Sequence, residues 1–242
     1  MNTLLCNLSR KVLAATAAVC LVATVPVRAT SNDSTYVMST RAVQHTTMSA
    51  SVGGTLTMLP KPLTEYSVPA PMIDVRWRLA FPFGLHAFGR AGSNVATSIA
   101  QAGGYYARDV GPLTLAVGYS VSFVYGNLTY IDGFNSLEQR WMNHPMIATS
   151  WSIAEYTLSA RIEAELTTAQ DRTIDEQVVG SNANLFTGAS VTLTLEQPFF
   201  GTTNVLLGVT IARSSNPYQS WFLYNTFQDR LITTEFIVGF YL

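Results

Sequence analysis

The stretch that decides the fold is LTLAVGYSVSFVY, residues 113–125, in which large apolar side chains alternate with mostly small ones. The positions that share the large apolar face are Leu113, Leu115, Val117, Tyr119, Val121, Phe123 and Tyr125. In a β-strand, successive side chains point to opposite faces of the sheet, whereas a helix would scatter both sets around its circumference. The stretch therefore predicts a strand with one apolar face and one small, mostly polar face.

The same two-residue period recurs along the chain, in residues 48–58, 73–81, 158–166, 189–196 and 205–211. The face opposite the apolar residues carries most of the charge. The charged and histidine side chains on that second face are Asp74, Arg76, Arg78, His86, Arg90, Arg161, Glu163, Glu165, Glu196 and Glu235. This pattern predicts an all-β protein built from an antiparallel sheet with two chemically different faces.

The connections between the expected strands alternate in length. We predict ten strands, over residues 44–58, 71–81, 84–92, 95–108, 112–126, 145–154, 158–169, 185–196, 203–213 and 230–242. Four connections are short: 81–84, 108–112, 154–157 and 197–201. Those at the other end are long at 59–70, 127–144, 170–184 and 214–229, and tight only near 92–94. This sorting is typical of closed transmembrane β-barrels, although counts of eight and twelve strands stay open.

The start of the chain has the features of an export signal. Arg10 and Lys11 precede an apolar run at 12–25, and small residues flank Arg28 at the end of the segment. We expect a signal peptide over residues 1–29 cleaved after Ala29, a periplasmic tail over 30–43 and a barrel over 44–242. The apolar run is shorter than the roughly 20 residues of a spanning helix, and a retained anchor is the alternative.

Composition excludes several classes of function. Both cysteines, Cys6 and Cys20, lie in the expected signal peptide, so the mature chain would have no disulfide, cysteine metal site or cysteine nucleophile. The charged fraction is 12%, about half of the roughly 25% of an average globular protein. Since the mature chain would hold 15 acidic against 11 basic residues and no basic stripe, we expect no nucleic-acid partner.

The final strand carries a motif. Its sequence FIVGFYL, residues 236–242, resembles the C-terminal assembly signal of bacterial outer-membrane β-barrels, in the residues Phe236, Val238, Phe240, Tyr241 and Leu242. The family signal usually ends in an aromatic residue, which this chain replaces with leucine. In size and pattern the chain is similar to small barrels of the outer-membrane protein A type. The resemblance implies one closed sheet in the outer membrane of a Gram-negative bacterium, inserted by the barrel assembly machinery after escort by periplasmic chaperones.

A lipid environment fixes which face points outward. Lipid offers the backbone no hydrogen bonds, so a sheet that spans it must close. An arginine facing lipid near the midplane costs about 2–4 kcal/mol. We therefore expect the ten charged and histidine residues named above to form an ion-pair network in a largely plugged lumen. Aromatic girdles are expected at the turn end and at the loop end. The turn-end members are Phe81, Phe83, Phe199, Phe200 and Phe240, and the loop-end members are Tyr125, Tyr130, Trp141 and Trp221.

No catalytic motif is present: the sequence has no HExxH, no GxSxG and no P-loop. His45, His86 and His144 are interpreted as lumen or rim residues, and only His144 has a candidate acidic partner, Asp132. We expect no cofactor and no metal.

The predicted function is a monomeric outer-membrane barrel, surrounded by lipid, with a structural or loop-mediated surface-binding role. The ligand is undefined, and the candidate binding aromatics are Trp221, Phe222 and Tyr224 in the last long loop. The alternatives are a narrow pore for small solutes, an outer-membrane enzyme that modifies lipid or peptide, and a secreted soluble barrel of the lipocalin kind.

Overall fold

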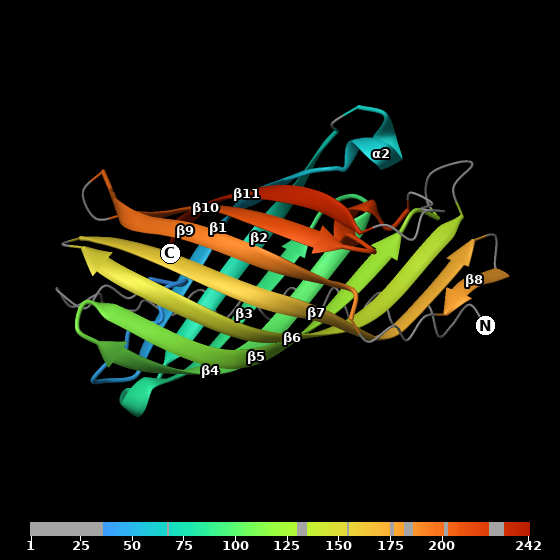
Figure 1. Cartoon of the computed structure of the whole chain (residues 1–242). Helices are drawn as coiled ribbons and strands as arrows, with labels where there is room; N and C mark the ends of the chain where they lie inside the picture. Colours follow the sequence, from blue (N-terminus) through green and yellow to red (C-terminus); the bar gives the residue numbers. More distant parts are fainter. Residues whose placement is uncertain are drawn as a thin grey trace.

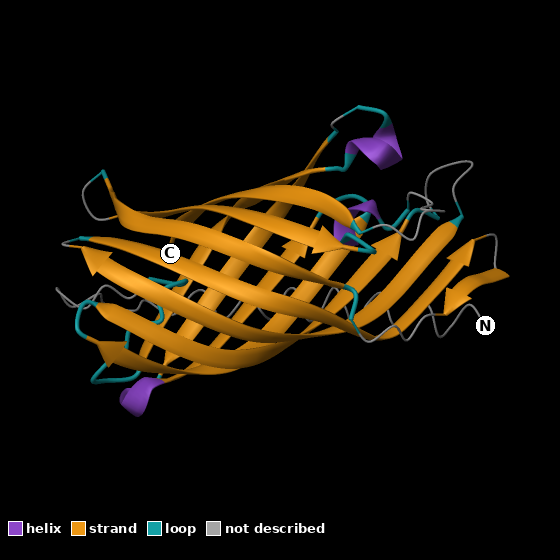
Figure 2. Ribbon diagram, in the orientation of Figure 1, coloured by secondary structure: helices purple, strands orange, loops and turns teal. Residues whose placement is uncertain are grey.

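Ten antiparallel strands close into one barrel in the computed structural model (Figures 1 and 2). The structure describes residues 36–66, 68–129, 135–153, 155–174, 177–181, 186–200, 203–222 and 230–242. The ring consists of β1 (Thr47–Met58), β2 (Pro69–Ala80), β3 (Leu85–Ser93), β4 (Thr97–Val110), β5 (Leu113–Asn127), β6 (Ser136–Ile153), β7 (Tyr156–Ile174), β9 (Gly188–Phe199), β10 (Thr203–Ser214) and β11 (Leu231–Tyr241). The prediction of an all-β, ten-stranded closed antiparallel barrel is confirmed.

The seam between β1 and β11 closes the ring. The two strands pair antiparallel from Ser51 opposite Tyr241 to Met58 opposite Thr234. All other neighbours in the ring are consecutive strands, apart from β7 and β9. These two pair directly with each other, although the additional strand β8 (Gln177–Ser181) lies between them in the sequence. β8 pairs with the last residues of β7 and extends the sheet beyond the ring (Figure 1). Closure gives the ring strands hydrogen-bonding partners on both sides.

The two faces of the sheet differ sharply in chemistry. Large apolar side chains point outward, as for Val117 (61% exposed) and Ile147 (57% exposed). The inward face buries polar and charged side chains, with Arg78 at 1% exposed and Glu196 at 0%. This arrangement is the reverse of a soluble protein, in which apolar side chains fill the interior. The period of two therefore sorts the chain into an apolar exterior and a polar lumen.

The connections are short at one end of the barrel and longer at the other. At the short end, η1 (Pro82–Gly84) joins β2 to β3, and two residues join β4 to β5. At the long end lie α2 (Lys61–Thr64) and η2 (Tyr218–Ser220). Among the described residues, no helix has the length and hydropathy needed to cross a bilayer. The predicted alternation of turns and loops thus places both ends of the ring, at β1 and β11, on the short-turn side.

β6 and β7 are longer than the sequence analysis expected. β6 begins at Ser136 and β7 runs to Ile174, so much of the expected loops 127–144 and 170–184 is strand. The polar run around Glu138 and Arg140 resembles a loop in composition. The structure instead turns these two side chains inward, where they form an ion pair with each other. In Figure 1, β6, β7 and β8 reach beyond the other strands at the long-loop end.

Gly53 supplies a test of the seam. A Cβ atom added at Gly53 would lie 1.9 Å from the backbone oxygen of Val238, across the β1–β11 seam. Because backbone atoms cannot rotate away, Gly53→Ala should destabilise the closed barrel by about 3 kcal/mol. Gly54→Ala is the matched control, since its nearest contact is 3.3 Å. Urea unfolding in detergent, followed by gel mobility without boiling, measures both. Equal midpoints for the two variants would show that the seam is not this tight.

Candidate functional site: the barrel lumen

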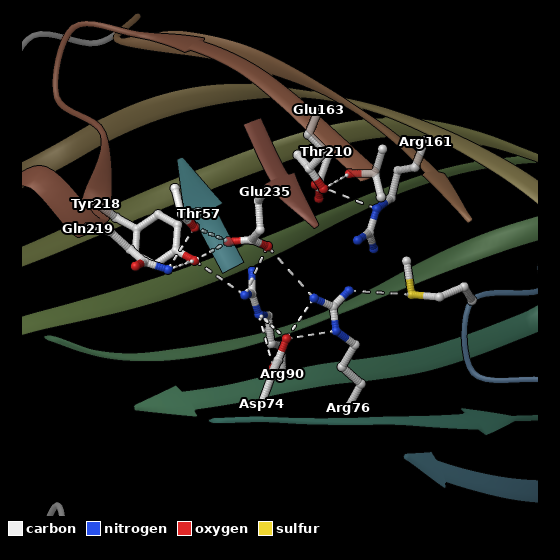
Figure 3. Close-up of polar contacts among 12 residues, drawn as sticks. Thr57, Asp74, Arg76, Arg90, Arg161, Glu163, Thr210, Tyr218, Gln219 and Glu235 are labelled. Carbon is white, nitrogen blue, oxygen red and sulfur yellow. Dashed lines mark hydrogen bonds and ion pairs between the residues drawn. The ribbon is translucent and has the colours of Figure 1, made fainter. Parts of the chain in front are cut away.

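Four charged side chains from three strands meet in the lumen (Figure 3). Asp74 of β2 accepts hydrogen bonds from Arg76 at 2.7 Å and from Arg90 of β3 at 3.1 Å. Arg90 also contacts Glu235 of β11 at 3.1 Å, so it bridges the two carboxylates. All four side chains are buried or nearly so. Desolvating an ion costs several kcal/mol, which only close pairing of this kind offsets.

The last long loop inserts into this cluster. Tyr218 of η2 donates its hydroxyl hydrogen to Glu235, and Arg90 lies 3.3 Å from the same hydroxyl oxygen. Gln219 donates to the hydroxyl of Thr57 at 2.8 Å, and Thr57 donates to Glu235 at 3.1 Å. Burial raises the pKa of Tyr218 above its ordinary value, so the phenol stays protonated and able to donate. The loop is therefore tied to β1, β3 and β11 from inside the ring.

The segment before β1 also lies inside the barrel. The backbone oxygen of Ser39 accepts hydrogen bonds from Arg78 of β2 and from Tyr105 of β4. On the other walls, the Thr40 amide donates to Ser150 of β6 at 2.9 Å. The Met38 amide donates to Glu196 of β9 at 2.9 Å. Within the expected periplasmic tail, residues 30–43, the described residues 38–40 contact the inner wall of the barrel. Inward-facing donors and acceptors on four strands bind the backbone of the segment within the lumen.

Further charges lie along the same inner surface. Arg161 and Glu163 of β7 approach to 3.5 Å, and both line the larger of two cavities together with Glu165. Glu138 and Arg140 of β6 form a fully buried pair at 3.1 Å. Arg140 also donates to the backbone oxygen of Asn216, at 2.5 Å, which ties β6 to the inserted loop. The sequence analysis missed Glu138 and Arg140, although each alternates with outward residues such as Trp141.

The histidines lie in different settings. His86 is buried and stacks on Tyr105 with ring centroids 4.5 Å apart. His144 is buried with its Nε2 atom 2.7 Å from the Ser122 hydroxyl, and its expected partner Asp132 lies outside the described residues. His45 is exposed before β1. In the part of the chain that the structure describes, no three His, Cys, Asp or Glu side chains are arranged to hold a metal ion.

Two cavities flank the ion cluster. One adjoins the N-terminal segment at Met38 and Thr40. The other, which is the larger of the two, adjoins the inserted loop at Asn216 and Tyr218. Both cavities are lined by Arg76, Arg90 and Arg161, which lie between them. The lumen thus contains polar space, divided at its middle by charged side chains and bounded by the two inserted segments.

Of the candidate binding aromatics Trp221, Phe222 and Tyr224, Trp221 does not lie on the surface. Trp221 is buried, at 3% exposed, and donates to the Thr97 hydroxyl at 2.9 Å. Its indole covers Gly126 of β5, where a side chain would clash. Phe222 packs edge-on against Trp221, and Tyr224 lies outside the described residues. The expectation of an exposed Trp221 in a binding loop or girdle is therefore wrong, because its N–H finds a partner inside the barrel mouth.

The residues of the C-terminal motif divide between the two faces. Phe236, Val238 and Phe240 point outward and are exposed, as is Leu242. Tyr241 points inward, where its hydroxyl donates to Glu196 and accepts from the Val37 amide at 2.6 Å. Tyr241 therefore helps to hold the N-terminal segment, a contact that the assembly-signal resemblance does not indicate.

Comparisons with known proteins add little to this geometry. No family model matches the chain, and no curated protein matches it. Among solved structures, Acinetobacter baumannii OccAB4 is similar over 81% of this chain, with 8% identity and a TM-score of 0.30, and the chain spans 62% of its length. A mutant of the Rh. blastica porin matches over 81% of this chain and all of its own, with 11% identity and a TM-score of 0.18. Scores this low carry no weight for function.

Removing one carboxylate tests the ion cluster. Asp74→Asn leaves Arg76 and Arg90 buried with a weaker partner, so we expect the barrel to lose about 3–5 kcal/mol of stability. Asp171→Asn is the control, because Asp171 is an exposed residue on β7. Urea-induced loss of the compact gel band reports both variants. An Asp74→Asn midpoint equal to that of Asp171→Asn would mean that the cluster contributes nothing.

Proposed function

We propose that the chain is an integral β-barrel of the bacterial outer membrane. Two segments of the chain itself, residues 36–40 and 216–221, close its lumen. The observation that carries the proposal is the sorting of side chains, apolar outside and charged inside. Exposing the apolar side chains of the outer face to water is unfavourable, whereas contact with lipid acyl chains is not. Large aromatic side chains gather near the short-turn end on the outer face, where an interfacial girdle belongs. They are Phe81, Phe83, Tyr106, Trp151, Tyr156, Phe199, Phe200 and Phe240.

The closure of the lumen rests on two independent insertions. Residues 36–40 bind four walls of the barrel near the short-turn end. Residues 216–221 bind β1, β3, β4, β6 and β11 near the long-loop end. Between them the ion cluster projects into the lumen from one stretch of wall, formed by β3, β2, β1 and β11. A solute would have to displace at least one of these insertions to pass.

We assign the proposed surface-binding role to the long-loop end of the barrel. A tilted strand crosses the hydrocarbon core with about 9–11 residues. β6 has 18 residues and β7 has 19, so both continue well beyond the membrane on the side of β8. Since Trp221 is buried, we assign the surface role to this β6–β7–β8 extension rather than to the aromatic loop. The ligand or partner it meets is a matter for binding experiments.

The route to the membrane and the absence of catalysis are part of the same proposal. The expected signal peptide and its cleavage after Ala29 lie outside the described residues. Export, chaperone escort and insertion by the assembly machinery follow from the motif at 236–242. His144 bonds to Ser122 and His86 stacks on Tyr105, which are packing roles, so we propose a non-enzymatic and monomeric barrel.

A narrow pore is the second candidate, and the two cavities favour it. Both are lined by Arg76, Arg90 and Arg161, so they lie on either side of the same charged side chains. If the inserted loop or the N-terminal segment leaves its site in the membrane, the cavities join into a polar path. The charges along that path are mixed, with Arg161 facing Glu163 and Glu165, so such a pore would select weakly between anions and cations.

Planar-bilayer recording separates the closed barrel from the pore. We expect the wild-type protein to give no discrete conductance steps, because both insertions block the lumen. A variant that lacks residues 36–43 and has Gly-Ser residues at 217–222 should give steady steps. The matched control replaces residues 177–181 of β8 with Gly-Ser residues, outside the ring, and should stay silent. Steady channels in the wild type would overturn the closed lumen and establish the pore.

A further inference from the structure

The outer surface of β10 ends in an arginine. Along this face Leu207 and Ile211 are exposed, and Arg213 follows at the long-loop end, also exposed. Arg213 pairs with Ile232 of β11 and with Ala189 of β9. Ile232 is 63% exposed on the same outer face. Arg213 is therefore the first charged side chain above the apolar belt on β10.

A second arginine lies beside it at the start of β11. Arg230 precedes Leu231, which pairs with Ser214 next to Arg213. Its guanidinium carbon lies 4.6 Å from the ring centroid of Phe186, a half-exposed residue just before β9. Stacking on a phenyl ring orients a guanidinium while its N–H groups remain free to donate.

Neither arginine is neutralised within the described part of the chain. The ion pairs found there join Asp74, Glu235, Glu138 and Glu163 to lumen arginines, and none involves Arg213 or Arg230. Four lumen arginines, Arg76, Arg90, Arg140 and Arg161, are thus paired with carboxylates, whereas Arg213 and Arg230 face outward and form no such pair with the described residues. A pair of guanidiniums on an exposed rim fits a phosphate, which accepts several N–H bonds at once.

We propose that Arg213, Arg230 and Phe186 bind the phosphorylated headgroup of an outer-leaflet glycolipid. This inference rests on the proposed membrane placement. The two ends of the ring lie on the short-turn side, which faces the periplasm, so the arginines lie at the level of the outer leaflet. The exposed Ile232 and Ile211 below them would contact the acyl chains of the same lipid. The continuity of charge with the apolar belt favours a lipid over a free phosphate ion.

The test measures binding of diphosphoryl lipid A to the purified, detergent-solubilised protein by native mass spectrometry. We expect the wild type to carry bound lipid A. Each arginine should contribute about fivefold to the affinity, so R213Q/R230Q should bind lipid A about 25-fold more weakly. R108Q is the matched control, because Arg108 is an exposed arginine on the outer face of β4 at the opposite end. It should bind like the wild type. Lipid A stripped of its phosphates should bind no better to the wild type than to R213Q/R230Q.

The outcomes separate this inference from the function on which it rests. Fractionation and heat-modifiable gel mobility are measured first, on wild type and variants alike. Recovery of the wild type as a water-soluble protein would overturn the membrane placement. With that placement established, equal lipid A affinity in the wild type and R213Q/R230Q would overturn the binding site alone. Competition by millimolar inorganic phosphate would assign the site to free phosphate and would also contradict the proposed lipid.

Discussion

The pairing of Asp74 with Arg76 and Arg90 is the interaction on which the lumen depends. A charged side chain on a strand surrounded by lipid can avoid the acyl chains only by pointing inward, and an inward charge needs a partner. Asp74 accepts hydrogen bonds from both arginines, and Arg90 also contacts Glu235 of β11, on the far side of β1. Because β1 closes the ring between β2 and β11, this cluster connects strands on both sides of the seam.

The rest of the lumen is organised around partners for inward-facing polar groups. These hydrogen-bonding partners come from segments that are not part of the strands. They are the backbone groups of residues 37–40 at one end of the barrel, and Tyr218, Gln219 and Trp221 at the other. These segments act as internal ligands that satisfy groups the strands leave unpaired. A barrel of ten strands is narrow enough for two such segments and one ion cluster to divide its interior. The same hydrogen bonds therefore hold these segments inside the barrel and connect the strands around them.

The sequence was most informative where the period of two was unbroken. β5 and β11 could be placed to within one or two residues, because large outward residues alternate with small or polar inward ones throughout. The start of β6 could not, since Ser136 to Arg140 is polar apart from Leu137 and resembles a loop in composition. Loops that fold inward leave no periodic signal at all. Trp221 looked like a surface aromatic, and only the tertiary contact with Thr97 reveals its burial.

The direction of the two faces is the central claim, and collision measurements test it most directly. The two cysteines, Cys6 and Cys20, precede residue 30, so single-cysteine variants that lack residues 1–29 can carry one spin label each. Labels at outward Leu193 and Val117, in the protein reconstituted into lipid vesicles, should collide often with oxygen and rarely with a water-soluble nickel complex. A label at inward Thr192 should not share that preference for oxygen. Frequent nickel collisions at Leu193 and Val117 would contradict the lipid-facing assignment and the barrel's place in the membrane.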